Sequence, residues 1–308
     1  MSPSRLLLAA LTAALTLPAC SQTGNPSASA TPRHHSILCC STNTNAGSIA
    51  IIRDGGQVWT HPVAEPANDG WLLSNGNVVY AHKSGATEVT PDHKIVWDHK
   101  CPAGYEIHAV QPLPNHRMMV MQGGPVPHIL EIDANTDTIE RDIVLPTNSM
   151  FREIRKTAAG TYIVPHFNQN KVSEYNDQGR EIWSAPAQTP WAAVRLKNGN
   201  TLISGGGSKY VREIDPKGAT VWEVKGDDLP GNPLLFPNEV LRLANGNTII
   251  CNWTGHNPET WNKANQLVEV TPDKKVVWVF NDWKDANSIS AAQILDDPGI
   301  AERAEIQR

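Results

Sequence analysis

The stretch Glu269-Val-Thr-Pro-Asp-Lys-Lys-Val-Val-Trp278 occurs earlier in the chain, with small changes, as Glu88-Val-Thr-Pro-Asp-His-Lys-Ile-Val-Trp97. In both copies a Pro-Asp turn joins two runs rich in β-forming residues, and Pro presets the backbone angle that the first turn position needs. Asn-Gly-Asn turns occur in three copies, at Gly76, Gly199 and Gly246. Gly76 and Gly199 lie three periods of about 41 residues apart, a period typical of propeller blades.

Each copy divides into four antiparallel strands, which in the Gly199 copy we expect at Trp191–Leu196, Thr201–Ser204, Tyr210–Ile214 and Ala219–Val224. Two less regular copies lie between the first two clear ones. Residues 36–61 supply three further strands and residues 288–295 a fourth. Pairing of the C-terminal strand with the N-terminal strands then completes a sixth blade and closes the ring. The sequence therefore predicts an all-β, six-bladed propeller over residues 36–298, followed by a C-terminal tail at 299–308.

Two residue types recur at equivalent places in the copies. A tryptophan ends the last strand of most copies, at Trp59, Trp97, Trp183, Trp222 and Trp278. A glutamate lies in the middle of a strand, at Glu88, Glu131, Glu174, Glu213 and Glu269. Residues repeated around a ring cannot all lie at one site, so we assign both sets to packing between blades.

The N-terminal residues differ in composition from the rest of the chain. Arg5 precedes an apolar run from Leu6 to Leu17, too short to span a bilayer, so residues 1–20 read as a signal peptide. Ala19-Cys20 resembles a bacterial lipobox, with Cys20 as the lipidation site, and residues 21–35 read as a flexible tether. The expected location is the bacterial cell envelope, as an outer-membrane lipoprotein anchored through Cys20.

Charge and cysteine content narrow the remaining possibilities. The net charge of -5 and the lack of basic clusters argue against nucleic-acid binding. Cys39, Cys40, Cys101 and Cys251 follow the proposed lipidation site. A Cys39–Cys251 disulfide and free buried thiols are both compatible with the sequence.

With the motifs Leu-x-Asn-Gly-Asn-Thr and Glu-Val-Thr-Pro-Asp-x-Lys-Val-Val-Trp, residues 36–298 resemble secreted PQQ-like β-propeller repeat proteins. Members of that group mostly serve as binding or scaffolding modules, and more distant relatives resemble arylsulfotransferases and quinoprotein dehydrogenases. We do not expect PQQ itself, because those dehydrogenases are much longer and Cys39-Cys40 alone makes no cofactor motif. The arylsulfotransferase resemblance implies a nucleophilic His108, but the supporting residues of that family have no match here.

Function is expected where the copies differ. At the starts of the first strands lie unlike residues, Asn68, His108, Arg152, Trp191, Asn238 and Ser290. At the ends of the second strands lie His82, Gln122, His166, Gly205 and Asn252. The loops 226–238 and 252–262 are also lengthened beside one blade. Because loops carry function on rigid scaffolds, we expect a ligand site on this channel-mouth face.

Two functions fit that face. The first is binding of a glycan or a partner protein by a monomer, through His82, Gln122, Trp191, Asn238, Asn252, Trp253 and His256. The second is a polysaccharide lyase in which Arg152 or a divalent metal neutralises a uronate carboxylate and His108 or His166 removes the adjacent proton. In that case His82 and His166 are the candidate metal ligands. The lack of a local catalytic motif favours binding.

Overall fold

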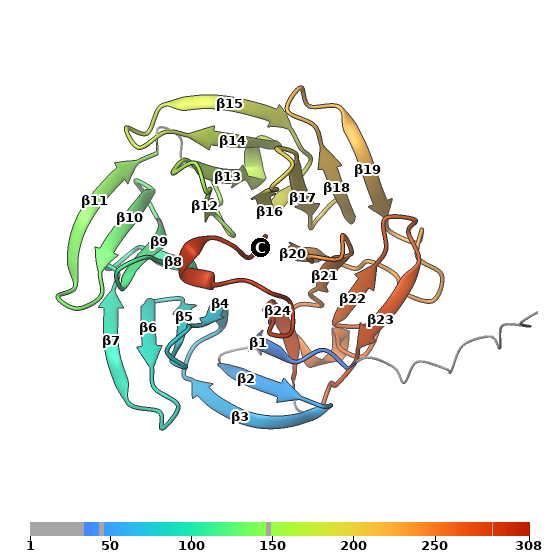
Figure 1. Cartoon of the computed structure of the whole chain (residues 1–308), viewed down its shortest axis with the longest axis horizontal. Helices are drawn as coiled ribbons and strands as arrows, with labels where there is room; N and C mark the ends of the chain where they lie inside the picture. Colours follow the sequence, from blue (N-terminus) through green and yellow to red (C-terminus); the bar gives the residue numbers. More distant parts are fainter. Residues whose placement is uncertain (1–33, 43–45, 146–148, 285) are drawn as a thin grey trace, which may run out of the picture. The chain divides into compact units, whose positions relative to one another are not determined.

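A computed structural model describes residues 34–42, 46–145, 149–284 and 286–308. Within residues 34–308 the strands form six four-stranded antiparallel sheets arranged as blades around an axis (Figure 1). The predicted six-bladed propeller is therefore confirmed. In the described part of the chain, no helix is both long enough and apolar enough to cross a membrane.

The first three blades follow the order of the chain, apart from the first strand of blade 1. Blade 1 contains β24 (Ser288–Ile294), β1 (Ile37–Thr42), β2 (Gly47–Arg53) and β3 (Gly56–Val63). Blade 2 contains β4 (Ala67–Leu72), β5 (Val78–His82), β6 (Gly85–Val89) and β7 (Ile95–Lys100). Blade 3 contains β8 (Glu106–Leu113), β9 (Arg117–Gly123), β10 (His128–Asp133) and β11 (Thr138–Val144).

The other three blades repeat this plan. Blade 4 contains β12 (Arg155–Lys156), β13 (Tyr162–His166), β14 (Lys171–Tyr175) and β15 (Glu181–Pro186). Blade 5 contains β16 (Pro190–Arg195), β17 (Thr201–Gly205), β18 (Tyr210–Ile214) and β19 (Thr220–Lys225). Blade 6 contains β20 (Pro237–Arg242), β21 (Thr248–Asn252), β22 (Leu267–Val270) and β23 (Val276–Phe280). Short 3-10 helices are η1 (Phe167–Gln169), η2 (Pro258–Thr260) and η3 (Ala301–Arg303).

The Asn-Gly-Asn turns owe their shape to local chemistry. Gly76, Gly199 and Gly246 have φ angles of 88°, 87° and 88°, which an L side chain adopts only with strain. In the Gly76 turn, Asn75 Oδ1 accepts a hydrogen bond from the backbone N–H of Asn77 at 2.9 Å. The turn residues therefore set the hairpin between the first two strands before any packing is considered.

The ring closes through β24, which pairs antiparallel with β1 in the register Ile37↔Ile294. Figure 1 shows these two strands side by side although they come from opposite ends of the propeller sequence. The predicted closure is therefore confirmed. It leaves blade 1 with the same four-stranded sheet as its neighbours.

The repeated glutamates join neighbouring blades, as the packing assignment required. Glu213 of β18 accepts from Asn200 of its own blade at 2.6 Å and from Arg242 of blade 6 at 2.8 Å. The same arrangement pairs each of the other four glutamates with a basic residue of the next blade, in the pairs Glu88–His116, Glu131–Lys156, Glu174–Arg195 and Glu269–His35. The repeated tryptophans also bridge blades, and Trp222 Nε1 donates to Pro272 O at 2.9 Å.

The expected tether needs one correction, at its last residue. His35 is buried and its two ring nitrogens each lie 2.9 Å from a carboxylate oxygen, one of Glu269 and one of Asp296. The ordered propeller therefore begins before residue 36. The predicted signal peptide at 1–20, the lipidation site Cys20 and the tether up to residue 33 lie outside the described residues.

Of the two possibilities left open for the cysteines, the structure has free thiols. Cys39, Cys40 and Cys251 are buried and Cys101 is partly exposed. Burial raises the pKa of the Cys39 thiol to about 12. The buried thiols are therefore protonated and act as small apolar side chains in the core.

Residues 299–308 return to the ring axis and fill one part of the channel (Figure 1). Arg308 is fully buried there, and its guanidinium donates to Asp69 Oδ1 at 2.6 Å and Glu239 Oε1 at 2.7 Å. Arg155 donates to the same two carboxylates, at 3.0 and 2.9 Å. The segment called a tail is thus part of a buried ionic network that joins blades 2, 4 and 6.

Candidate functional site

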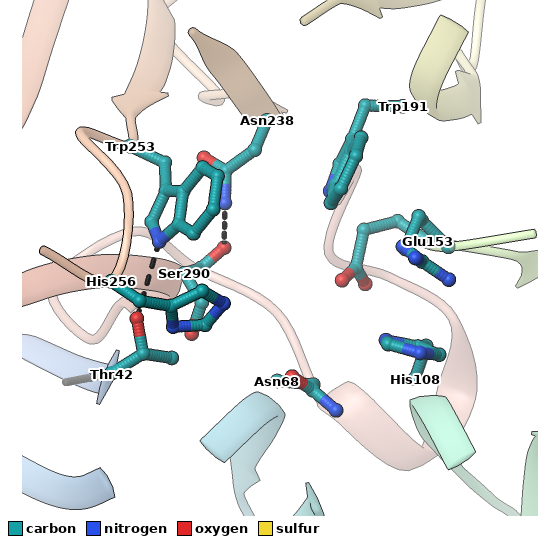
Figure 2. Close-up of a pocket in the computed structure, with 10 residues that line it drawn as sticks. Thr42, Asn68, His108, Glu153, Trp191, Asn238, Trp253, His256 and Ser290 are labelled. Atoms are coloured by element: carbon teal, nitrogen blue, oxygen red, sulfur yellow. Dashed lines mark hydrogen bonds between the residues drawn. The ribbon is translucent and has the colours of Figure 1, made fainter. Parts of the chain in front are cut away.

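The first-strand starts surround one cavity at the channel mouth. All six predicted positions line it, from Asn68 of β4 to Ser290 of β24, together with Thr42, Glu153, Trp253 and His256. The cavity holds about 100 Å³ (Figure 2). Each blade contributes a residue because the first strand of every blade is the one nearest the axis, and the equivalent ends of these strands point the same way.

An aromatic wall forms one side of the cavity. The Trp191 and Trp253 rings lie nearly parallel, with centroids 6.3 Å apart and an interplanar angle of 23°. Phe236 packs edge-on against both, at 4.8 Å from Trp191 and 5.5 Å from Trp253. Trp253 Nε1 donates to Thr42 Oγ1 at 3.2 Å, which fixes its ring to blade 1. The wall is therefore a rigid apolar surface suited to a flat or CH-rich ligand face.

Arg152 brings a positive charge to this wall. Its guanidinium lies 5.1 Å from the centre of the Trp191 ring and donates to Phe151 O at 3.0 Å. The Glu106 and Glu153 carboxylates are near enough to raise the pKa of this guanidinium, but their ion pairs are with His108 and Arg155. Burial lowers the pKa of Arg152, but Arg remains charged at neutral pH. The cavity thus contains a partly buried cation whose two carboxylate neighbours bond other side chains.

His108 lies beside Arg152 and forms a pair with a glutamate. Its Nε2 lies 3.0 Å from Glu106 Oε2, and its side chain is 16% exposed. Burial and the nearby Arg152 lower the pKa of His108 to about 4 despite the Glu106 contact, and His108 lowers the pKa of Glu106 to about 2. The imidazole is therefore neutral at pH 7, with Nε2–H donated to Glu106 and Nδ1 left as an acceptor.

Glu153 is a cavity residue that the sequence analysis missed. Figure 2 shows its carboxylate directed into the cavity between Trp191 and His108. Its Oε2 lies 3.0 Å from Arg155 Nη2 but makes no hydrogen bond with any described residue. Burial, followed by the charge of Asp69, raises its pKa well above the usual range. The signal that could have identified Glu153 is its position, because it directly follows the predicted mouth residue Arg152.

A second hollow of about 440 Å³ adjoins the first and shares His108 and Arg152 with it. Its other walls include Gly104, Gly124 and Asn168. Ligand pockets for small molecules usually measure about 300–1,000 Å³. The 440 Å³ hollow is therefore of ligand size, and the 100 Å³ cavity is a smaller, more enclosed subsite beside it.

Comparison with known proteins gives a family. Residues 82–275 match the family described as Mal s 1 allergenic protein-like. The chain belongs to this family. No curated protein matches it.

Solved structures similar to this member of the Mal s 1 allergenic protein-like family share its fold. A protein of unknown function from Bacteroides caccae is 28% identical, with a TM-score of 0.75 over 84% of this chain and 97% of that one. A streptogramin B lyase structure is 13% identical, with a TM-score of 0.58 over 85% and 87% of the two chains. A catalytically inactive virginiamycin B lyase from Staphylococcus aureus with quinupristin is also 13% identical, with a TM-score of 0.57 over 81% and 86%. These two likenesses show the fold alone, and the PQQ-like lipoprotein type is not confirmed.

In this Mal s 1-like propeller, the predicted second-strand residues do not line the mouth cavity. His82 is buried and bonds Glu65 and Thr87, at 2.8 and 3.2 Å. His166 is buried against the Tyr175 hydroxyl, and Gln122 is buried in β9. The physical reason is that second strands lie one strand spacing, about 4.8 Å, farther from the axis than the first.

The expected metal site therefore has no support in this geometry. His82 and His166 lie in blades 2 and 4. In the described ranges, the cluster close enough to hold a metal consists of Asp69, Glu153 and Glu239, without a histidine. Two arginines already pair with those acids. Burial lowers the pKa of His166 to about 4, so this residue is a neutral core histidine.

The lengthened loops contribute residues that face the cavity and a residue that holds the two loops together. Trp253 and His256 face the cavity, with ring centroids 5.0 Å apart. Asn252 does not face it: its side chain accepts from the backbone N–H of Leu235 at 2.8 Å and of Phe236 at 3.2 Å. Asn252 thus ties the loop 226–238 to the loop that carries Trp253. The predicted ligand role of Asn252 stays a prediction, and in this structure its side chain bonds the backbone of the neighbouring loop.

Proposed function

We propose that this protein binds an acidic glycan at the mouth of its propeller. The observation that carries the proposal is the Arg152 guanidinium, which is partly buried at the cavity, lies against the Trp191 ring and makes no ion pair with its carboxylate neighbours Glu106 and Glu153, because these bond His108 and Arg155. A charge taken out of water is costly unless it finds a partner. A carboxylate ligand supplies that partner.

The aromatic wall specifies the rest of the ligand. An indole packs well against the apolar CH face of a sugar ring, and the stacked pair Trp191 and Trp253 supplies indole surface at the cavity. Arg binds carboxylates through two parallel hydrogen bonds. A uronic acid residue offers both groups on one ring, so it fits this combination better than a neutral sugar or an apolar ligand.

The test is calorimetric titration of purified protein with galacturonate oligosaccharides and with neutral galactose oligosaccharides of equal length. We expect binding of the acidic series and about 10- to 100-fold weaker binding after Arg152→Met, since hydrogen bonds to charged groups contribute about 1.5–3 kcal/mol. Arg180→Met, at an exposed turn of blade 4, is the matched control and should bind as the wild type does. Equal affinity for the neutral series, or an unchanged Arg152→Met variant, would refute the proposal.

A lyase is the second candidate, and one observation favours it. Burial lowers the pKa of His108 to about 4 and raises the pKa of Glu153 well above its usual range, and both residues line the cavity that contains Arg152. Opposed pKa shifts in one site are the usual mark of a base and an acid. In elimination, His108 Nδ1 takes the proton next to the carboxylate, the carbon–carbon double bond forms, and the glycosidic oxygen leaves with a proton from Glu153.

The lyase candidate makes a separate measurable claim. Incubation with polygalacturonate should give the ultraviolet absorbance of an unsaturated uronate, and His108→Asn should abolish it while leaving binding within a few-fold. If wild-type protein binds the polymer and no absorbance develops, binding alone is the function. A base with a pKa of about 4 is weak at neutral pH, which is why binding stands first.

We also propose that the propeller is exported and anchored through Cys20. The support is the apolar run from Leu6 to Leu17 followed by Ala19-Cys20. Expression of the full chain in a bacterium and fractionation of its envelope tests this. Cys20→Ser should move the protein from the membrane fraction to the soluble fraction, and an unchanged distribution would contradict the anchor.

A further inference from the structure

The mouth cavity ends at a closed floor. Below Glu153, the Arg155 side chain lies within 3.0 Å of its Oε2, and the network of Arg155, Arg308, Asp69 and Glu239 fills the axis. The side chains of this network are at most 5% exposed. The central channel is therefore not a passage at this level, and a ligand enters and leaves the cavity by the same opening.

The size of the cavity limits how much of a ligand reaches the floor. Its volume is about 100 Å³, whereas an engineered cavity that takes up benzene measures about 150 Å³. Less than one whole six-membered ring fits at full depth. The remainder of a larger ligand has space in the adjoining 440 Å³ hollow, which is reached past His108 and Arg152.

The polar floor contains one buried amide oxygen without a hydrogen-bond partner among the described residues, beside a buried carboxyl group that contacts Arg155. Among the described residues, Asn238 Oδ1 has no hydrogen-bond partner, whereas Glu153 Oε2 lies 3.0 Å from Arg155 Nη2, and both residues line the cavity. Asn238 is held in place by its other amide atom, because Nδ2 donates to Ser290 O. More than about 90% of buried polar atoms in proteins are hydrogen-bonded, so the exception at Asn238 supports contact with a ligand or water there.

The chemistry of this floor suits hydroxyl groups. A neutral carboxyl and an amide both donate and accept, as does a sugar hydroxyl. A second carboxylate would have to desolvate next to the Asp69 and Glu239 charges, and an ammonium group would lie near Arg152 and Arg155. Hydroxyls carry no charge and avoid both penalties.

We propose that the mouth cavity takes up the hydroxyl-bearing edge of the terminal residue of an acidic glycan, with Glu153 and Asn238 bonding its hydroxyls while Arg152, between the cavity and the adjoining hollow, holds its carboxylate. This proposal rests on the proposed function and specifies it. A chain that continued in both directions from the bound residue would need a second opening, which the ionic network closes. An internal residue therefore does not reach the floor.

The test counts chain ends. Galacturonate polymers of several defined lengths are titrated into the protein, and the number of protein molecules bound per gram of sugar is measured. If ends are bound, this capacity falls in inverse proportion to chain length, so a tenfold longer chain binds tenfold less protein per gram. A capacity per gram that is independent of length would overturn end capture while leaving the proposed function intact.

Variants at the floor supply the second readout. Glu153→Gln keeps a neutral donor and acceptor and should bind a trisaccharide within about threefold of the wild type. Glu153→Leu removes both and should weaken binding by about tenfold or more, since an unmet hydrogen bond costs about 1–3 kcal/mol. Thermal unfolding of both variants checks that they are folded. If the Leu variant binds the trisaccharide as tightly as the wild type does, the role of Glu153 is overturned. If the wild type binds no acidic ligand, or if Arg152→Met leaves binding unchanged, the proposed function itself is overturned.

Discussion

Replacing Arg308 tests how much the buried network contributes to the stability of the propeller. The Arg308 guanidinium is fully buried, contacts Asp69 at 2.6 Å and Glu239 at 2.7 Å, donates to Gly70 O at 2.6 Å, and lies 4.1 Å from the Trp71 ring centre. Arg308→Met preserves most of the volume and the apolar stem but removes the charge. Two carboxylates are then left to share Arg155.

The expected loss in the free energy of unfolding is about 3–5 kcal/mol, the usual cost of removing one partner from a buried ion pair. For a domain of this size each kcal/mol lowers Tm by about 2–4 °C, so Tm should fall by on the order of 10 °C. Differential scanning calorimetry measures it. Arg303→Met, on an exposed residue of the same segment, is the matched control and should change Tm by about 1 °C or less.

The pH dependence of this loss follows from its cause. Without Arg308, one carboxylate of the pair has its pKa raised above the unfolded value, so the folded variant binds an extra proton. The variant therefore regains stability as pH falls, and the gap to the wild type should be smaller at about pH 5 than at about pH 8. Adding Asp69→Asn should cost the Arg308→Met variant less than it costs the wild type. A Tm loss below about 2 °C, or equal costs of Asp69→Asn in both backgrounds, would refute this account.

Three further outcomes follow from single side chains. Burial lowers the pKa of His35, but its hydrogen bonds to Glu269 and Asp296 raise this pKa above 6.5 overall. The contribution of His35 to the free energy of unfolding is therefore complete below pH 6.5 and is lost as pH rises through the pKa of the folded state. His35→Gln should thus destabilise the protein by about 2 kcal/mol in denaturant titrations at about pH 5.5 and by much less at about pH 9. Asn252→Leu loses the clamp between two loops and should cost about 3 kcal/mol and weaken oligosaccharide binding, whereas binding that survives intact would show that the clamp is not needed for the aromatic wall. In the native propeller Cys101 should react with a thiol reagent well before the three buried cysteines, and peptide mass spectrometry measures the rate at each site. Equal rates at these four cysteines would contradict the burial of the other three.

The repeat made the fold predictable because its signals are local. An Asn-Gly-Asn turn needs a positive φ whatever surrounds it, and in the Gly199 copy the predicted strands match the observed ones to within one residue at each end. Equivalent positions in equivalent strands then identify the residues around the mouth, including Arg152, although β12 itself is only two residues long.

The rest of the site depends on contacts between parts of the chain that carry no shared pattern. Glu153 joins the cavity through a bridge to Ala192 of blade 5, and Phe236 reaches the wall from a loop without a counterpart in other blades. Residues 299–308 have neither strand alternation nor a repeat partner, so nothing in the sequence indicates that they fill the channel. His82 and His166 failed as mouth residues because strand position along the chain does not give distance from the axis.

The pairing of β24 with β1 also sets an order of events in folding. Ser290 Oγ donates to Cys40 O across 250 residues of sequence. During synthesis β1 therefore cannot pair with β24 until almost the whole propeller has been made. During that interval its free edge is exposed to strands of other chains, and contacts so distant in sequence form slowly. The segment that completes the ring is followed directly by the one that carries Arg308 into the axis. Removing residues 288–308 should therefore leave five complete blades that form but aggregate, and the interval before β24 is synthesised is the stage at which the chain is most prone to aggregation.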